Sequence, residues 1–261
     1  LIPSRVTRLV AAEPNRDGSA TLFIRDEGGG TRAETIPFHP WLLVSGAALA
    51  ESVPGSAEVI PLSGGGIYNQ RVSFPCQAEY VDAIKHLKQK TGAPPSSPMS
   101  PYRVVSDLTQ QLLALLPARL FRGMAFADVR RLQLDIETYT TPGYDFPNAS
   151  RDGDEIIIVS LSDSTGWEHC LSGPEMSEQE ILREMVRLIC ERDPDVIEGH
   201  NLFNFDLPYI ETRCKKQKVK LAIGRDGSVA KGRSSRFTAG ERTATYTRYD
   251  IYGRHIVDTY Q

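Results

Sequence analysis

Two carboxylates end a strand-like segment at residues 132–140, with the sequence LQLDIETYT. Leu134 and Ile136 alternate with polar residues, so period-two geometry puts Asp135 and Glu137 on one face of the strand. Neighbouring carboxylates repel each other, and burying them costs free energy unless a cation lies between them. The pair is therefore either solvated surface or part of a metal site.

The D-x-E spacing alone favours solvated surface, because the spacing is common. Two other pairs share it in stretches typical of loops, Asp152/Asp154 and Asp193/Asp195. A metal site at Asp135 and Glu137 is favoured only by their position. They lie at the end of the first strand of the fold that the later residues predict.

The segment EGHNLFNFDLPYI, residues 198–210, supplies a further carboxylate, Asp206. Asp206 opens a predicted helix and can simply cap it, while Asn201 can simply turn the chain after a strand. In the alternative, Asp206 projects beside Asp135 and Glu137 at the carboxyl end of the neighbouring strand. Three carboxylates and a substrate phosphate can then hold two Mg²⁺ or Mn²⁺ ions, because hard cations choose oxygen ligands.

The first third of the chain predicts strands separated by Gly and Pro, in RVTRLVAA, SATLFIRD and FHPWLLVSG. Helical spacing follows over residues 77–92, with Gly92 as a stop signal. SDLTQQLLALL predicts another short helix, capped by Ser106 or Asp107. We expect one unit to give way to the next near residues 117–128.

The predicted order from there is strand, strand, strand, helix, strand, helix. RRLQLDIET, IIIVSLS and WEHCL are the three strands, and their tight connections predict an antiparallel meander. Ser177 and Glu180 have the spacing of a capping box that starts the next helix. DVIEG and FDLPYIETRCKKQ follow as strand and helix. This is the element order of the ribonuclease H-like α/β fold, a mixed sheet flanked by helices.

The bulk composition indicates a globular protein of a reducing, cytoplasmic setting. The chain has 261 residues, of which 40% are hydrophobic, enough for a real core. Its 4 cysteines are scattered without C-x-x-C spacing, so neither a zinc site nor a disulfide framework is expected. No apolar run has the length that spans a bilayer, so we expect no membrane association. Leu1 in place of Met suggests an excised piece.

Charge is unevenly distributed along the chain. The formal net charge is −3, yet residues 213–254 contain twelve Lys or Arg against three acids, a local +9 that leaves −12 for the remainder. The basic stretch is either the solvated end of a helix, where cations suit the helix dipole, or a surface that attracts the phosphates of DNA. The candidate DNA contacts are Arg225, Lys231, Arg233 and Arg236.

LDIET followed by GHNLFNFDLPYI resembles the first two exonuclease motifs of family B DNA polymerases, D-I-E and N-x-x-x-F-D, in the same order and on the same elements. GRHIVDTY is similar to the strand that follows in that family, and IPFHPWLLVSG resembles its N-terminal domain. The resemblance implies a β-rich α+β N-terminal domain over 1–125 and a C-terminally incomplete, ribonuclease H-like 3′–5′ exonuclease domain over 126–261. The implied activity is proofreading, the removal of mismatched nucleotides from the 3′ end of DNA.

The resemblance also implies roles for single residues. Asp135, Glu137 and Asp206 would be catalytic and would bind two Mg²⁺ or Mn²⁺ ions, one lowering the pKa of a bound water and one stabilising the leaving 3′ oxygen. The implied substrate contacts are Asn201, Phe205, Ile136 and Thr138. The implied partners are DNA, as a single-stranded 3′ end or a primer-template, and the remainder of a polymerase chain. We expect a monomer with a nucleoid-associated function in a prokaryotic cytoplasm.

The family completes its site with a third motif, Y-x-x-x-D, after the GRHIVDTY strand, and the chain stops at Gln261. The literal match from Tyr246 to Asp250 precedes that strand among β-forming residues, so we expect it in a hairpin strand, outside the site. TATYTRYDIYG fits the β-hairpin with which the family helps to separate primer from template. We expect a piece that binds metal and strand ends weakly and cleaves poorly or not at all.

Three further polar residues near the motifs are expected to have structural roles. We expect Asp258 to make a structural hydrogen bond. We expect the same of His200 and His255, because nothing nearby supplies the motif of histidine-type exonucleases.

Two other functions remain open. One is a stand-alone 3′–5′ exoribonuclease of the same superfamily, against which the β-rich first third and GRHIVDTY count. The other is a nucleic-acid-binding module with a vestigial site.

Overall fold

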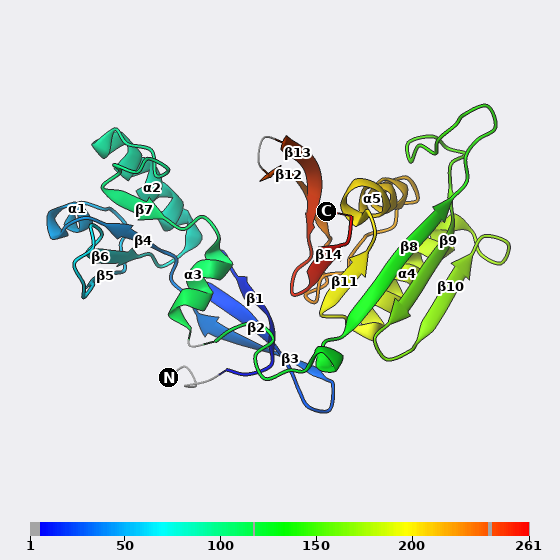
Figure 1. Cartoon of the computed structure of the whole chain (residues 1–261), viewed down its shortest axis with the longest axis horizontal. Helices are drawn as coiled ribbons and strands as arrows, with labels where there is room; N and C mark the ends of the chain where they lie inside the picture. The colour runs from blue at the N-terminus through cyan, green and yellow to red at the C-terminus, as the bar shows by residue number, and fades with distance from the viewer. Residues whose placement is uncertain (1–5, 117, 240–241, 261) are drawn as a thin grey trace. The chain divides into compact units, whose positions relative to one another are not determined.

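The computed structural model describes residues 6–116, 118–239 and 242–260 (Figure 1). The chain divides into two units, Leu1–Gly123 and Met124–Gln261. The division lies two residues before the expected boundary between 125 and 126. Among the described residues, no helix is long and apolar enough to cross a membrane.

The first unit contains two antiparallel sheets, one of three strands and one of four. The three-stranded sheet has the order β1-β2-β3, with β1 (Leu9–Pro14), β2 (Ser19–Arg25) and β3 (Thr31–Pro37). The four-stranded sheet has the order β5-β6-β4-β7, with β4 (Trp41–Val44), β5 (Glu58–Pro61), β6 (Gln70–Ser73) and β7 (Tyr102–Val104). The helices of this unit are α1 (Ala47–Glu51), α2 (Gln77–Thr91) and α3 (Leu108–Leu115).

The two helices that the sequence predicts in this unit are confirmed. α2 ends where Gly92 adopts a φ of 66°, a left-handed conformation that costs glycine least. Asp107, not Ser106, caps α3, because its carboxylate accepts hydrogen bonds from the backbone N–H of Thr109 at 2.9 Å and of Gln110 at 3.2 Å. The short elements α1, β5, β6 and β7 were not predicted.

The second unit contains a five-stranded mixed sheet of order β10-β9-β8-β11-β14. Its strands are β8 (Arg131–Thr138), β9 (Ile156–Asp163), β10 (Glu168–Ser172), β11 (Val196–Gly199) and β14 (His255–Asp258). β8, β9 and β10 form the predicted antiparallel meander, and β11 runs parallel to both β8 and β14. The other elements are a 3-10 turn (Phe126–Asp128), α4 (Glu178–Arg192), α5 (Leu207–Lys216) and an antiparallel hairpin of β12 (Lys231–Ala239) and β13 (Arg242–Asp250).

α4 begins through the predicted capping box. The Ser177 hydroxyl accepts from the backbone N–H of Glu180, whose carboxylate accepts in turn from the backbone N–H of Ser177 at 2.8 Å. Ile181, Met185 and Ile189 lie on one face of α4 and are fully buried. This apolar face packs into the core that the sheet shares with α5.

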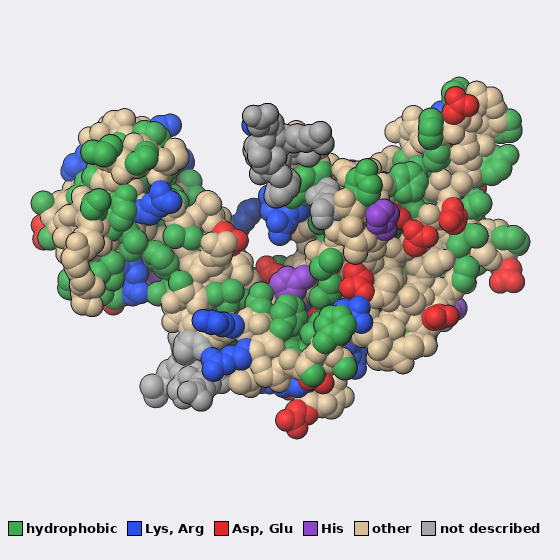
Figure 2. Space-filling view, in the orientation of Figure 1, with side chains coloured by type: hydrophobic (Ala, Val, Ile, Leu, Met, Phe, Trp, Pro, Cys, Tyr) green, Lys and Arg blue, Asp and Glu red, His purple; other side chains and the backbone are tan. Residues whose placement is uncertain are grey.

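β8 has the two faces that its alternation predicts. Leu134 and Ile136 are buried in the shared core, whereas Asp135 and Glu137 lie on the opposite face and are exposed. In Figure 1 α4 lies behind the sheet, so the face with the carboxylates is turned toward the viewer. Figure 2 shows Asp and Glu side chains scattered over the part of this unit that carries β8, β9 and β10.

Candidate functional site

Asp206 lies beside Asp135. The Asp206 side chain is only 2% exposed. Burial, and next the negative charge of Asp135, raise the pKa of the Asp206 carboxyl to about 6, against backbone hydrogen bonds from Asp206 itself and Ile136. Two of the three predicted carboxylates therefore come together, one from β8 and one from the start of α5.

Asp206 does not cap α5. It has helical φ and ψ angles of −61° and −55°, and its side chain makes no capping hydrogen bond. The residues before the helix, Leu202–Asp206, form a turn of π-helix that the sequence did not predict. Such turns are frequent at functional sites. The interpretation of Asp206 as a simple helix cap is therefore wrong.

Asn201 turns the chain into this π turn. Its φ of 67° is left-handed, a conformation that asparagine tolerates better than most residues. Its carbonyl oxygen accepts the backbone N–H of Phe205 at 2.9 Å. Phe205 is partly buried, and its ring centroid lies 5.4 Å from that of Tyr209. The turning role is established, and contacts of both side chains with substrate stay predictions.

Gly199 lets the π turn sit close to β8. A Cβ atom at this position would lie 2.7 Å from the Leu134 carbonyl oxygen and 2.8 Å from Leu202 Cδ2, nearer than real Cβ contacts come. Leu202 is itself fully buried. A residue without a side chain is therefore required where β11 ends.

The Asp135 and Asp206 pair fits a divalent cation. Neither carboxylate forms a salt bridge with Lys or Arg among the described residues, and adjacent carboxylates without a basic partner suit a hard cation. Glu137 does not complete a set of three. Within residues 6–116, 118–239 and 242–260, no three His, Cys, Asp or Glu side chains form a group that would hold a metal ion.

Two predicted substrate contacts lie on β8, and contact of either residue with substrate stays a prediction. The Ile136 side chain is 5% exposed and lies in the core, which leaves its backbone as the part that could contact a substrate. Its backbone N–H faces the Asp206 carboxylate. The Thr138 side chain forms a hydrogen bond with Tyr209, whose hydroxyl donates to the Asp154 carbonyl oxygen at 2.8 Å.

Arg225 is not a DNA contact. Its side chain is 4% exposed and pairs with Asp193 at 2.8 Å and Asp195 at 2.7 Å, while also donating to the Gly253 carbonyl oxygen. A buried guanidinium held in this way does not reach a DNA backbone, which corrects the prediction. Asp193 and Asp195 are thus structural, although they share the spacing of Asp135 and Glu137.

The other predicted basic contacts lie on β12 and are exposed. Lys231 and Arg236 face solvent, and Arg233 pairs with Asp250 across the hairpin. The Y-x-x-x-D match that ends at Asp250 lies in β13, as predicted for a hairpin strand. The Tyr246 ring centroid lies 5.6 Å from that of Phe203 in the π turn, so the hairpin packs against this turn.

A cavity of about 580 Å³ opens on the exposed face of the sheet beside Asp135. Its lining comes from β8, β9, β10 and the end of β11, together with the residue after β11. The lining residues are Gln133, Leu134, Asp135, Ser160, Leu161, Ser162, Glu168, His169, Cys170, Gly199 and His200. His200 Nδ1 also lies 3.1 Å from Thr259 Oγ1, and His255 lies in β14.

All four cysteines are free thiols.

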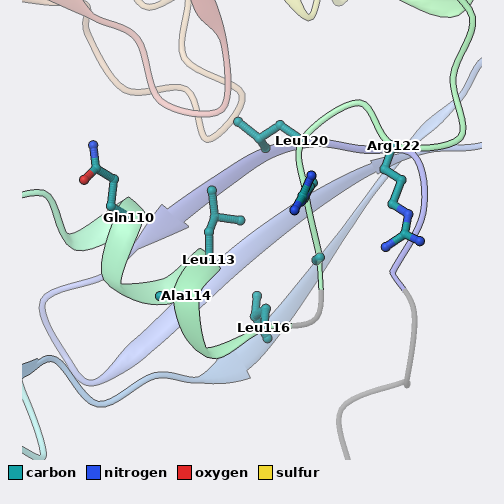
Figure 3. A pocket seen from close by; sticks show the side chains of 8 residues that line it. Gln110, Leu113, Ala114, Leu116, Leu120 and Arg122 are labelled. Atoms are coloured by element: carbon teal, nitrogen blue, oxygen red, sulfur yellow. The ribbon is translucent and has the colours of Figure 1, made fainter. Parts of the chain in front are cut away.

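A larger cavity, of about 730 Å³, belongs to the first unit (Figure 3). It lies along α3 and the following loop and is lined by Gln110, Leu113, Ala114, Leu116, Ala118, Arg119, Leu120 and Arg122. This lining contains no carboxylate and no nucleophile. Of these two cavities, only the smaller one has carboxylates in its lining.

The mixed sheet, the helices on its apolar face and the carboxylate pair at the end of its central strand define a ribonuclease H-like exonuclease domain. The family described as DNA polymerase family B, exonuclease domain, matches residues 113–261, more than half of the chain. The chain belongs to this family. Exonuclease domains of the family are metal-dependent nucleases.

Known relatives are much longer than this chain. The DNA polymerase of Pyrococcus glycovorans is 34% identical over 141 residues, which are 51% of this chain and 16% of the relative. DNA polymerase 1 of Pyrococcus abyssi is 38% identical over 108 residues, 38% of this chain and 13% of the relative. A solved structure of the family B DNA polymerase from Pyrobaculum calidifontis matches in fold, with a TM-score of 0.66 at 21% identity, over 97% of this chain and 36% of that one.

Proposed function

We propose that the chain is the N-terminal and proofreading region of a DNA-directed DNA polymerase, and that it removes nucleotides from the 3′ end of DNA. The observation that carries the proposal is the buried Asp206 carboxylate beside Asp135 at the carboxyl end of β8. Family membership supports the reaction, and the length of the relatives supports action within a larger polymerase chain. The archaeal relatives support a site of action at a prokaryotic nucleoid.

In this proposal Asp135 and Asp206 bind the divalent ions, and Glu137, exposed on the same face of β8 as Asp135, joins them as the third ligand only once a cation is bound, since no group of three ligands forms among the described residues without it. Bound Mg²⁺ or Mn²⁺, held by these carboxylates, would supply Lewis-acid chemistry that activates water near neutral pH and stabilises the negative charge of a leaving oxygen. Asp206, with a pKa of about 6, releases its proton as a cation binds.

The same proposal assigns the strand contacts. The Asn201 amide donates hydrogen bonds to the frayed 3′ strand, and the Phe205 ring packs near a base. Lys231 and Arg236, exposed on β12, attract its phosphates. The chain acts as a monomer on a single-stranded 3′ end or a primer-template.

A nucleic-acid-binding module with a vestigial site is the second candidate. It is favoured by the lack of any group of three His, Cys, Asp or Glu ligands among the described residues. For the same reason we expect the chain by itself to cleave slowly or not at all.

The experiment is the incubation of a 5′-labelled single strand with the chain in Mg²⁺ or Mn²⁺. We expect slow shortening from the 3′ end only, abolished in Asp135→Asn and kept in Asp152→Asn, whose exposed carboxylate has the same spacing in a loop. Shortening that survives in Asp135→Asn contradicts the proposed site. Rapid degradation contradicts the expectation of weak activity, and strand binding with no cleavage at any metal concentration favours the vestigial module.

A further inference from the structure

The Asp258 carboxylate accepts three backbone hydrogen bonds. Its Oδ1 accepts from the N–H of Asn201 at 2.8 Å and of Tyr260 at 3.0 Å, and its Oδ2 accepts from the N–H of Phe203 at 2.9 Å. Two of these donors belong to the segment that leads into Asp206. One side chain of β14 thus uses both oxygens to hold a turn that begins 57 residues earlier.

The held residues are linked directly to Asp206. The Asn201 carbonyl oxygen accepts the N–H of Phe205, and the π turn ends at Asp206, the residue after Phe205. Hydrogen bonds to the N–H groups of Asn201 and Phe203 therefore fix the backbone at the start of the π turn, on either side of Leu202. A negative charge also suits the N-terminal end of a helical segment, where N–H groups lack partners within the helix.

The sheet places Asp258 where this contact is possible. β14 pairs in parallel with β11, with Asp258 opposite Gly199, and the Thr259 N–H donates to the Gly199 carbonyl oxygen at 3.0 Å. Gly199 is the residue that lets the turn approach β8. β14, the strand beside β11, therefore ends next to the start of the π turn and places the Asp258 carboxylate there.

We propose that Asp258 is a positioning residue of the nuclease site, which holds the Asn201–Asp206 segment so that Asp206 faces Asp135. Asp258 acts through the backbone of this segment, because both of its carboxylate oxygens accept backbone N–H groups. The inference rests on the proposed function only in taking the carboxylate pair as a metal site.

The test compares Asp258→Ala and Asp258→Asn with Asp107→Ala in the whole chain. Asp107 is the matched control, because its carboxylate also accepts two backbone N–H groups, at the start of α3 in the other unit. Backbone amide exchange by NMR reports the turn, and Mn²⁺ titration followed by electron paramagnetic resonance reports the site. The asparagine variant keeps one accepting oxygen, so it remains informative if the alanine variant does not fold.

In Asp258→Ala we expect faster exchange across residues 199–207 and a loss of Mn²⁺ affinity of about 10-fold or more, the size typical of groups that orient metal ligands. In Asp258→Asn we expect the loss to be smaller and exchange to rise more at Phe203 than at Asn201. In Asp107→Ala exchange should rise only in α3, with Mn²⁺ affinity unchanged.

Unchanged Mn²⁺ affinity in both Asp258 variants, or an equal loss in Asp107→Ala, would overturn the inference. Failure of the proposed function is seen separately, because Mn²⁺ binding would then survive in Asp135→Asn. The exchange rates at Asn201 and Phe203 still report on the turn in that case.

Discussion

Asp206 lies buried beside Asp135, and this neighbour together with burial raises the pKa of the Asp206 carboxyl to about 6. Asp154 is buried too, which would raise its pKa, yet its carboxylate accepts hydrogen bonds from the Thr141 hydroxyl and N–H and from the Asn148 N–H and pairs with Arg151, and these contacts lower its pKa. The two carboxylates therefore differ in their partners. Asp154 pairs with groups of the protein itself, whereas Asp206 lies beside another carboxylate, as the proposed metal site requires.

The stability of the metal-free chain should depend on Asp206. An unfolded Asp has a pKa of about 3.9, so between pH 4 and 6 the folded state binds the proton that the unfolded state releases. The free energy of unfolding should therefore fall as pH rises through this window, by on the order of 2 kcal/mol from this group. Urea unfolding in EDTA measures it. Asp206→Asn should remove this part of the decline, and an identical pH profile in the variant would contradict the assignment.

The buried ion pair of Glu178 and Arg213 should be essential to the second unit. The two charged groups lie 2.6 Å apart, with side chains 2% and 1% exposed. Arg213→Met leaves a buried carboxylate without its cation and should cost about 3–5 kcal/mol in urea unfolding. Lys215→Met is the control, since Lys215 pairs with Glu211 at the surface, and it should change stability by less than about 1 kcal/mol. Equal effects of the two variants would refute the distinction.

Arg225 and Lys231 should behave oppositely. Arg225→Ala removes the partner of Asp193 and Asp195 and should destabilise the fold by about 3 kcal/mol or more, with no change in the salt dependence of DNA binding. Lys231→Ala should leave stability unchanged and reduce the slope of log K against log salt by about 0.7, the value for one contact with single-stranded DNA. Fluorescence anisotropy with a labelled strand at several salt concentrations measures the slope. A lower slope for Arg225→Ala alone would show that Arg225 contacts DNA after all.

Gly199→Ala should strain the junction of β11 and the π turn. The added methyl group would overlap the Leu134 carbonyl oxygen and the Leu202 side chain, so the turn must move away from β8. We expect a loss of stability of about 1–3 kcal/mol by thermal or urea unfolding. Gly65→Ala, where no atom lies within 4 Å, is the control. A stable variant that binds Mn²⁺ normally would show that the close approach is not needed.

Local patterns in the sequence were sufficient to predict most of the second unit. Alternation identified β8, and the spacing of Ser177 and Glu180 located the start of α4, because both signals lie within a few residues. The burial of Arg225 was not predictable in this way, since Asp193 and Asp195 lie about 30 residues away. A charge count does not distinguish a paired guanidinium from a free one.

The candidate site was predicted only in part, because some of its contacts join residues that lie far apart in the sequence. The sequence predicted Asp206 beside Asp135, as the structure has it, although Asp206 follows β11 through a π turn and does not lie at the strand end itself. The π turn depends on the fit between β11 and β8 and on Asp258 of β14, a contact of long range that no local period contains. Ile136 was assigned to substrate from a motif, and the alternation of its own strand turns its side chain into the core, so only its backbone is left for such a contact.

The titration of the chain with Mn²⁺, followed by electron paramagnetic resonance of the free ion, tests the central claim most directly. We expect the unaltered chain to bind Mn²⁺, with affinity at least about tenfold weaker in Asp135→Asn and in Asp206→Asn and unchanged in Asp152→Asn. Equal affinity in the unaltered chain and in both site variants would contradict a metal site at the Asp135 and Asp206 pair.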